Sequence, residues 1–552
     1  MPFSSILSRG NLIILVCISV INGLLLFFAS MKFMLSLQQS GYRGKRYFKW
    51  LASPETPYLS RLMLLCLLGF LFFLVLCTTF SSIVGEKIAS YVGFASYLLF
   101  IVAYIRTESA VNAKVPLKKT KRLVRLCVTF ILCATVISFG LMLLLDLIAS
   151  SIGSTVVYLV RYSLICGMPI LMPYILFLAY LINEPFEEII KRYYLKRAKN
   201  KLDKSKVLKI GITGSYGKTS IKEILKTILS QKYRVLATPA SYNTPLGIAI
   251  TSKNLDSTHD IFIAEMGARS KGDIKELAAL VKPSYGVLTG INNQHLETFG
   301  SPETIKDTKF ELFENLAENG KGFFSTDSEG VRELYERFGG EKFCAGLSGE
   351  NNLVTATDIS TGQHGMSFTL VIRGEKPVKC NTVLLGRHSV SNICLAAAVA
   401  YKIGLTPQEI AQGINRIQSI GHRLELMPNN KNIVIIDDSY NSNEDGIKAA
   451  MEVLDTFSGR KIVLTPGLVE LGKIENVANL AFGNLLAKHV DIVIIIGKHN
   501  AEMLINGLTA GGMDKSNIFF AKTLNKGNAM LNEMLREGDV VLFENDLPDN
   551  YS

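Results

Sequence analysis

Long apolar stretches dominate the first third of the chain. A helix that crosses a membrane needs about 20 consecutive, predominantly apolar residues. Stretches of this kind follow one another with only short polar loops between them, which is not typical of core helices in a soluble protein. We therefore predict an α-helical membrane domain over residues 1–183. Its five transmembrane helices are expected at Leu12–Leu35, Leu62–Val84, Ile88–Ile105, Leu123–Ala149 and Val156–Ile182.

The loops between these stretches differ in charge. Lysines and arginines gather after the first, third and fifth stretches, whereas the other two loops carry almost none. Because basic loops stay on the cytoplasmic side of a membrane, we predict a multi-pass protein of the cell membrane whose amino terminus is outside and whose carboxyl-terminal half is cytoplasmic. Residues 184–206 place aromatic and aliphatic residues at helical spacing among charges, which predicts an amphipathic linker at the membrane surface.

The remaining residues alternate short β-branched runs with helical patterns, as in an α/β protein. We expect a central domain over residues 207–427 and a Rossmann-like C-terminal domain over residues 428–552. Residues 352–385 alternate polar and apolar positions like the short strands of an inserted sheet. Strands of the last domain are predicted at Lys461–Leu464, Asp491–Ile496, Ile518–Ala521 and Asp539–Phe543.

Charge and cysteine content exclude two classes of function. The net charge of +12 could indicate a nucleic-acid partner, but the basic residues flank apolar stretches. The soluble half has no stripe of arginine interleaved with aromatics, so we expect no nucleic-acid binding. Basic runs beside a membrane attract anionic lipid headgroups instead. The nine cysteines form no CxxC pair and are interpreted as reduced packing residues.

A glycine turn joins the first predicted strand of the soluble half to a helix. The strand, Val207–Thr213, is followed by Gly214-Ser215-Tyr216-Gly217-Lys218-Thr219-Ser220 and by a helical pattern over Ile221–Leu229. Such a turn presents backbone N–H groups and a helix amino terminus to phosphate. Lys218 could reach the β- and γ-phosphates of a nucleotide, and the Thr219 hydroxyl could ligate Mg²⁺. The usual GxxxxGK spacing is not met because position 212 is Ile212, so a chance glycine turn remains an alternative.

A carboxylate and a histidine follow the next two buried strands. Glu265 ends the apolar run that begins at Asp260, and His295 follows the strand Tyr285–Ile291. The carboxyl ends of parallel strands are where open α/β sheets bind ligands. A buried glutamate is costly unless it is paired or metal-bound. A lone histidine here would more often be structural, but together with Glu265 and Thr219 it favours a metal site.

These motifs resemble the Mur ligase family, which builds the peptide of peptidoglycan. The glycine turn is similar to the family's ATP loop, and the likeness continues over most of residues 207–500. It is strongest to the branch that adds D-alanyl-D-alanine to UDP-N-acetylmuramoyl-tripeptide. The resemblance implies a P-loop-type central domain in which Gly214, Ser215, Gly217, Lys218, Thr219 and Ser220 bind ATP.

The resemblance also implies two Mg²⁺ ions. Glu265 and His295 match family residues that help to bind them, beside Thr219. Lys309, in KDTKFELF, matches a lysine that the family carbamylates so that the carbamate holds the second ion. Chemistry alone would not select Lys309 over Lys306; only the motif does.

Further segments resemble the family's substrate and nucleotide contacts. Asn243 and Thr244 match residues beside the γ-phosphate, although a plain Asn-Pro-Gly turn is an alternative. Asn392 matches a residue that contacts adenine, Arg423 one that approaches the phosphates or ribose, and Asp438 one that contacts ribose.

Two departures from the family limit what can be carried over. Soluble members have an amino-terminal domain that binds the UDP-sugar, and here the predicted membrane helices stand in its place. Near the last strand, a basic K-G-S-R-like segment is replaced by Phe543-Glu544-Asn545-Asp546. The identity of the incoming amine therefore cannot be transferred.

The resemblance implies an ATP-dependent carboxylate–amine ligase that works through an acyl phosphate. It would add an amino acid or short peptide to a cell-wall precursor, either linked to a polyprenyl membrane lipid or soluble and UDP-linked. A non-catalytic membrane scaffold of cell-wall synthesis is a further alternative, and an ATP-driven transporter is disfavoured because the apolar stretches hold few charges.

Overall fold

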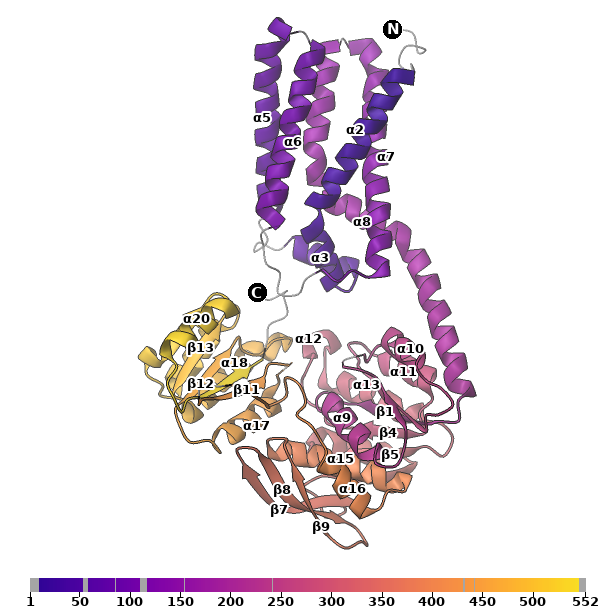
Figure 1. Ribbon diagram of the computed structural model, residues 1–552, viewed down its shortest axis with the longest axis vertical. Helices are drawn as coiled ribbons and strands as arrows, with labels where there is room; N and C mark the ends of the chain where they lie inside the picture. The colour runs from indigo at the N-terminus through magenta and orange to yellow at the C-terminus, as the bar shows by residue number, and fades with distance from the viewer. Residues whose placement is uncertain are drawn as a thin grey trace. The chain divides into compact units, whose positions relative to one another are not determined.

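The computed structural model describes residues 9–52, 58–84, 86–109, 117–152, 154–240, 242–429, 432–440 and 442–545. The chain divides into two compact units, Met1–Ile190 and Lys191–Ser552. The first is helical, and the second contains two α/β domains. Each unit is described by itself below, with elements labelled as in Figure 1.

Helices alone make up the described part of the first unit (Figure 1). α2 packs beside α7, and α5 packs beside α6. Leucine, valine and isoleucine side chains are exposed along every long helix of this unit, so its outer surface is apolar. The helices are α2 (Arg9–Ala29), α3 (Met31–Gln39), α4 (Gly44–Leu51), α5 (Tyr58–Val84), α6 (Glu86–Ser109), α7 (Lys121–Ile152) and α8 (Ser154–Lys204).

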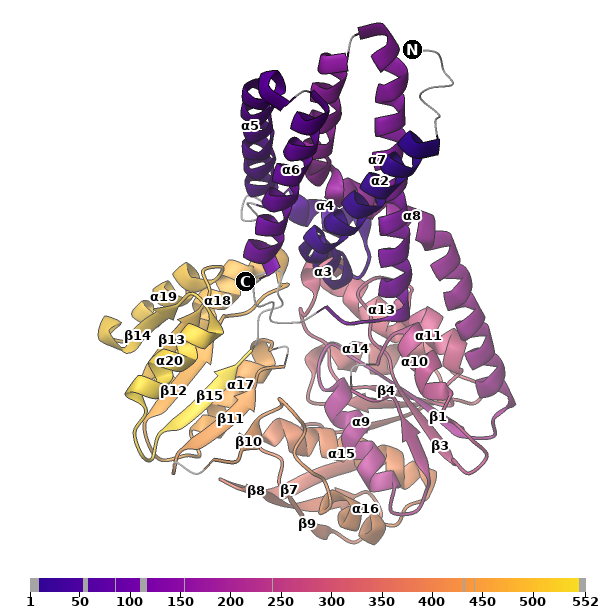
Figure 2. The same ribbon diagram turned by 45° about the horizontal axis from the view of Figure 1, so that its top comes forward.

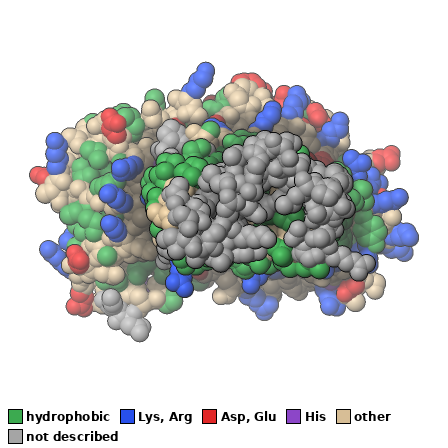
Figure 3. Space-filling model, turned by 90° about the horizontal axis from the view of Figure 1, so that it is seen from above, with side chains coloured by type: hydrophobic (Ala, Val, Ile, Leu, Met, Phe, Trp, Pro, Cys, Tyr) green, Lys and Arg blue, Asp and Glu red, His purple; other side chains and the backbone are tan. Residues whose placement is uncertain are grey.

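Three stretches within these helices are long and apolar enough to cross a membrane by length and composition: Leu12–Ala29, Lys121–Leu144 and Gly167–Lys204. The second and third predicted spans correspond to α5 and α6, in which the shorter apolar stretches are Arg61–Phe72 and Ala95–Thr107. Seen from above, the described side chains of this region are mostly hydrophobic (Figure 3).

Two predicted boundaries differ from the structure. The first apolar stretch is two helices, α2 and α3, separated at Ser30, whose hydroxyl donates to the carbonyl of Phe27. The last stretch and the predicted linker form one helix, α8, although it contains Pro169, Pro173 and Pro185.

A buried polar network joins four helices of the first unit. Asn22 of α2 donates through Nδ2 to Ser138 of α7 at 2.9 Å and contacts Met168 Sδ of α8 at 3.3 Å. Its Oδ1 accepts from the hydroxyl of Tyr97 of α6 at 2.8 Å. Because a polar group in an apolar surround must be satisfied internally, this network fixes the four helices against one another.

The basic segments after the first and third predicted spans lie together. Gln38 of α3 donates to the carbonyl of Lys118 at 2.9 Å and accepts from its amide at 2.8 Å. The guanidinium of Arg122 lies 3.9 Å from the ring centre of Tyr42. Both segments therefore belong to the same end of the helical unit, as the predicted orientation requires.

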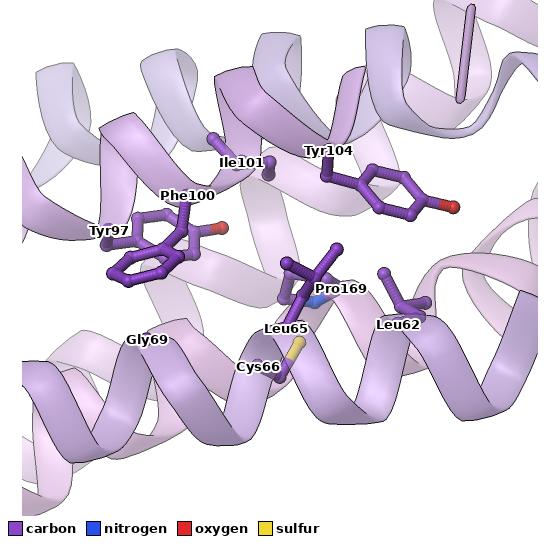
Figure 4. Close-up of a pocket in the computed structure, with 9 residues that line it drawn as sticks. All are labelled: Leu62, Leu65, Cys66, Gly69, Tyr97, Phe100, Ile101, Tyr104 and Pro169. Atoms are coloured by element: carbon purple, nitrogen blue, oxygen red, sulfur yellow. The ribbon is translucent and has the colours of Figure 1, made fainter. Parts of the chain in front are cut away.

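A small cavity lies among α5, α6 and α8. It holds about 20 Å³ and is lined mainly by apolar groups, including Leu65 of α5 and Pro169 of α8. The rings of Tyr97 and Tyr104 enter it from α6 (Figure 4). A space of this size accommodates roughly one water molecule, so it is a packing gap.

The first α/β domain of the second unit is built on a nine-stranded sheet ordered β2-β3-β1-β4-β5-β6-β7-β8-β9. Strands β2 to β7 pair in parallel, and β7, β8 and β9 are antiparallel. Short strands were predicted over residues 352–385, but as an inserted sheet, whereas β7 to β9 continue the main sheet. The strands are β1 (Leu208–Thr213), β2 (Val235–Ala237), β3 (Ile261–Glu265), β4 (Tyr285–Leu288), β5 (Lys321–Ser325), β6 (Glu341–Ala345), β7 (Val354–Gly362), β8 (Gly365–Ile372) and β9 (Val378–Thr382).

Helices cover this sheet (Figure 2). The apolar faces of α9 and α15 share one core with β1, β3 and the antiparallel strands. A second core joins α10, α11 and α13 and includes Ala198 and Leu202 from the end of α8. The helices are α9 (Lys218–Leu229), α10 (Pro245–Ser252), α11 (Asp273–Val281), α12 (Leu296–Phe299), α13 (Pro302–Glu314), α14 (Glu329–Arg337), α15 (Arg387–Ile403) and α16 (Pro407–Ile414).

The C-terminal domain has a six-stranded sheet ordered β10-β11-β15-β12-β13-β14, parallel except for β10. All four strands predicted in the last domain are present. The strands are β10 (Glu425–Met427), β11 (Val434–Asp438), β12 (Lys461–Thr465), β13 (Ile492–Ile496), β14 (Ile518–Ala521) and β15 (Val540–Glu544). The helices are α17 (Glu444–Leu454), η1 (Gly472–Ile474), α18 (Glu475–His489), α19 (Ala501–Ala510), η2 (Lys515–Asn517) and α20 (Leu524–Met534).

Candidate functional site

Strand order places the glycine turn at a switch point of the larger sheet. β1 lies between β3 and β4, so the connections that leave β1 and β3 run to opposite sides of it. Ligands of open α/β sheets bind outside the carboxyl ends of the strands at such a point. The turn after β1, Glu265 at the end of β3 and the segment after β4 therefore meet at one edge of the sheet.

The turn itself depends on two glycines. Gly214 has φ 150°, and a Cβ there would lie 2.0 Å from Thr289 Oγ1. Gly217 has φ 77° and precedes the first residue of α9. Lys218 Nζ donates to the carbonyls of Gly214 at 2.7 Å and Ser215 at 2.9 Å. Burial lowers the pKa of Lys218 to about 8; attraction to Glu265 opposes this shift, and repulsion from Arg423 adds to it.

The Glu265 carboxylate is contacted by three other side chains. Its Oε2 accepts from the Thr219 hydroxyl at 3.0 Å, and its Oε1 accepts from Asn243 Nδ2 at 3.2 Å. Lys222 of α9 donates to Oε2 at 3.3 Å and to the carbonyl of Ala240 at 2.6 Å. Thr219 and Asn243, which the sequence singled out separately, thus both contact this one buried carboxylate.

Lys309 is buried on α13, with 3% of its surface exposed. Desolvation, followed by repulsion from the Lys218 ammonium, lowers its pKa well below the usual value, while Asp273 and Glu311 oppose the shift. Its amine lies 5.6 Å from the ring centre of Phe299. Lys306, three residues earlier, instead pairs with Glu333 at 2.6 Å on the surface. The structure therefore separates two lysines that chemistry alone could not.

His295 has left-handed backbone geometry, with φ 62°, immediately before α12. Its Nδ1 contacts the Glu470 carboxylate of the C-terminal domain. A carboxylate on one ring nitrogen is the arrangement that orients a metal-ligating histidine. Within the residues that the structure describes, no three His, Cys, Asp or Glu side chains gather as a metal site; the expected ligand set instead combines Glu265 and His295 with a hydroxyl and a lysine.

Thr244 serves a structural purpose besides any role with substrate. It is the N-cap of α10, where its hydroxyl accepts from the Gly247 amide at 3.3 Å. It lies next to Asn243, which contacts Glu265. The turn interpretation and the substrate interpretation of this segment are therefore compatible.

A cavity of about 1070 Å³ extends from the glycine turn to the C-terminal domain. Gly217, Ser220 and Asn392 line its wall in the first α/β domain, and Arg423 and Asp438 line it on the other side. The predicted adenine and ribose contacts thus face the same space as Gly217 and Ser220 of the predicted phosphate loop, whereas Lys218 and Thr219 are not among the residues that line it.

On the C-terminal side of the cavity, Arg423 and Asp438 interact electrostatically. The Arg423 guanidinium lies 4.6 Å from the ring centre of Tyr440. Burial raises the pKa of Asp438 to about 6, although Arg423 and the hydrogen bond from the Leu424 amide lower it. Burial also lowers the pKa of Arg423, and Asp438 is the first group to oppose that shift.

Two site residues were missed in the sequence. Lys222 carried a signal, because it is one turn after Thr219 on the apolar face of α9, where a lysine requires a buried partner. Glu470 carried none, since nothing in the local pattern shows that it contacts His295, 175 residues away.

Comparison with known proteins identifies relatives of the second unit. Residues 212–400 match the family described as Mur ligase middle domain, and residues 422–544 match the Mur ligase, glutamate ligase domain. The UDP-N-acetylmuramoyl-tripeptide–D-alanyl-D-alanine ligase of Bacillus subtilis (strain 168) is 29% identical over 346 residues, which cover 61% of this chain and 72% of the relative. The ligase of the same name from Escherichia coli (strain K12) is 31% identical over 296 residues, covering 53% of this chain and 65% of the relative.

Solved structures agree in fold. The MurF ligase from Thermotoga maritima in complex with ADP superposes with a TM-score of 0.58 at 25% identity, covering 64% of this chain and 80% of that one. MurF from Acinetobacter baumannii gives a TM-score of 0.60 at 23% identity, with coverages of 65% and 78%. Residues 1–211 lie outside both family matches.

Proposed function

Since the chain belongs to the Mur ligase family, whose members are ATP-dependent amide ligases, we propose that it joins an amino acid or short peptide to a cell-wall precursor. The observation that carries this proposal is the contact of Thr219, Asn243 and Lys222 with Glu265 beside the glycine turn. A non-catalytic scaffold would have no need to bring these groups together around a buried carboxylate.

ATP is proposed to occupy the cavity. Its phosphates would lie over residues 214–220, where Lys218 supplies the positive charge and the start of α9 supplies backbone N–H groups. Asn392 would face adenine, and Arg423 and Asp438 would face the ribose and phosphates. The structure with ADP from Thermotoga maritima supports nucleotide binding in a fold of this kind.

Two Mg²⁺ ions are proposed beside the γ-phosphate, held by Thr219, Glu265, His295 and Lys309. Carboxylate and hydroxyl oxygens are the ligands that Mg²⁺ prefers, and the contact with Glu470 orients the His295 ring. The ions would neutralise charge during phosphoryl transfer. The donor set fits provided that Lys309 presents oxygen rather than an ammonium.

Lys309 is proposed to be carbamylated. Only a neutral amine adds CO₂; an N–C bond forms, a proton leaves, and the lysine becomes an anion with two oxygens. Burial and the neighbouring Lys218 favour the neutral amine. Lys309→Ala is therefore expected to abolish most activity, with partial rescue by acetate at high concentration. Lys306→Ala should be nearly silent, because Lys306 lines the cavity only through a solvent-accessible pair with Glu333 and is not a proposed metal ligand. Equal effects of the two substitutions would contradict the carbamate.

The reaction is proposed to have two steps. A substrate carboxylate attacks the γ-phosphorus of ATP, the bond to ADP breaks, and an acyl phosphate forms. The amine of the second substrate then attacks the acyl carbon, phosphate leaves, and the amine gives up a proton. Asn243 and Thr244 would flank the transferred phosphoryl group from the segment between β2 and α10.

The acceptor is proposed to be a muramoyl peptide attached to a polyprenyl-linked membrane lipid. The three apolar stretches of sufficient length support this choice, as does the gathering of basic segments at one end of the helical unit, which would lie at the cytoplasmic face. The relatives' names specify UDP-N-acetylmuramoyl-tripeptide, so a UDP-linked acceptor is the second candidate. The amphipathic part of α8 would rest at the membrane surface.

One experiment tests activity and acceptor together. The full chain in lipid nanodiscs and a fragment beginning at Lys191, which keeps Ala198 and Leu202 in their core, are assayed for ADP release on both acceptors. We expect Mg²⁺-dependent turnover that Lys218→Ala abolishes, and we expect the fragment to lose most ligation. Full activity of the fragment on the UDP-linked peptide would favour the second candidate, and turnover that survives Lys218→Ala would contradict the phosphate-loop assignment.

A further inference from the structure

The last strand of the C-terminal sheet ends in a buried acid. Glu544 closes β15 and has no exposed surface. In the parallel pairing of β11 with β15, Glu544 is opposite Asp438. Residues in register on neighbouring strands point to the same face of a sheet, so the Glu544 carboxyl lies beside that of Asp438, a residue of the cavity wall.

The side chain of Glu544 accepts a single hydrogen bond within the described part of the chain. Its Oε1 accepts from the Ser442 hydroxyl, and its Oε2 is buried without a hydrogen-bond partner. A buried carboxylate that lacks a cation is strongly destabilising. The one charged side chain that acts on Glu544 is Asp438, which repels it.

Within the described part of the chain, the elements packed against Glu544 place no cation beside it; Lys448 of α17 is exposed. β12, the other neighbour of β15, carries Leu464 and Thr465 at this end, both uncharged. α17 begins with the acidic residues Glu444 and Asp445, which line the cavity. The nearby cation, Arg423, acts on Asp438 instead.

Asn545, directly after β15, forms hydrogen bonds with two residues of the cavity wall. The Asn545 amide donates to the carbonyl of Asp438 at 3.2 Å, and Asn545 Oδ1 accepts from the Ser442 amide at 3.3 Å. Asp438, Tyr440 and Ser442 line the cavity, whereas Glu544 does not. Glu544 therefore acts on a nucleotide only through the residues in front of it.

We propose that Glu544 is a positioning residue that remains a neutral carboxylic acid and holds Asp438 and Ser442 in place for nucleotide binding. Ionised, it would add a second negative charge beside Asp438 and push Asp438 away. Burial, followed by repulsion from Asp438, raises the pKa of Glu544 well above its usual value. The nucleotide part of this inference rests on the proposed function; the protonation state does not.

The first test measures stability against pH with the full-length protein in detergent. An acid whose pKa is raised on folding keeps its proton in the folded state after the unfolded state has lost it. Stability then falls as pH rises from about 4.5 to the folded pKa, by roughly tenfold in the unfolding equilibrium per pH unit. Glu544→Gln mimics the neutral acid and removes this loss, so it should become progressively more stable than wild type between pH 5 and 8.

A matched control is Glu533→Gln, which changes an exposed glutamate of α20 and should follow the wild-type curve. Lys218, whose pKa is lowered to about 8, is common to all variants and cancels in the comparison. A Glu544→Gln curve parallel to wild type would overturn the neutral acid.

The second test measures ADP affinity at pH 7 by calorimetry. Glu544→Gln should bind ADP within about twofold of wild type, because it keeps a neutral group that can bond with Ser442. Glu544→Ala removes that bond and should weaken binding roughly tenfold. Wild-type affinity in Glu544→Ala, or strong loss in Glu544→Gln, would overturn the positioning role. If wild type itself binds no ADP, the proposed function fails, while the stability curves still report the proton on Glu544.

Discussion

Replacing Lys222 with methionine tests the buried charge cluster around Glu265. Lys222 has no exposed surface, and its ammonium lies 3.3 Å from Glu265 Oε2 and 3.3 Å from Glu223 Oε1. Methionine preserves the length of the side chain but removes the charge. Among the described residues, the Glu265 carboxylate then keeps hydrogen bonds from Thr219 and Asn243 but has lost the cation in contact with it. Breaking a buried pair in this way typically costs about 3–5 kcal/mol. For a domain of this size, that corresponds to a fall in Tm of roughly 6–20 °C.

The assay is thermal unfolding of the full chain at a fixed scan rate, with Lys226→Met as the control. Lys226 is one turn further along α9, its side chain is 48% exposed, and it lies 3.9 Å from Glu223. A surface pair of that kind contributes about 0–1 kcal/mol. Adding Glu265→Gln to Lys222→Met should restore much of the stability, because no unpaired charge then remains. If Lys222→Met and Lys226→Met unfold at the same temperature, the cluster does not stabilise the domain as argued.

Three further predictions concern affinity and topology. ADP affinity should fall as pH rises through about 8, because the Lys218 ammonium loses its proton there; calorimetry at pH 7 and 9 should show a drop that Lys218→Ala lacks. Arg423→Lys should raise the KM for ATP about as much as Arg423→Ala, roughly tenfold, because an ammonium cannot reproduce a planar group over Tyr440; a Lys variant with wild-type KM would refute this. A cysteine introduced at Lys118 should be labelled only from the cytoplasmic side and one at Gly153 only from outside; labelling of both from one side would contradict the predicted orientation.

Local pattern was sufficient for the strands and for the residues that follow them. Apolar β-branched runs located β1, β3 and β4, and the parallel pairing of these strands then brought the glycine turn, Glu265 and the segment of His295 to one edge. The contact between Thr219 and Glu265 follows from that topology. The strands β7 to β9 could also be predicted from the sequence, because polar and apolar residues alternate along a strand that is buried on one face.

Pairings between distant segments could not be predicted in this way. The bond between Gln38 and Lys118, the contact of His295 with Glu470 and the position of Glu544 beside Asp438 all depend on tertiary packing. The end of α2 could not be predicted either, because the hydrophobic pattern continues across the break between α2 and α3 at Ser30. Burial of Lys309 had no local signal, since a lysine on α13 would ordinarily extend into water.

The contact between His295 and Glu470 makes a proposed metal ligand dependent on a second domain. Glu470 belongs to the C-terminal domain, between β12 and η1, whereas His295 follows β4 of the first α/β domain. A carboxylate partner of a metal-ligating histidine typically contributes 10–100-fold to metal affinity. If the two domains separate, His295 loses its orientation, and Mg²⁺ should be held more weakly by the open enzyme. Metal retention would then report domain closure, and Glu470→Gln should weaken Mg²⁺ binding measured by calorimetry without changing a residue that touches the ion.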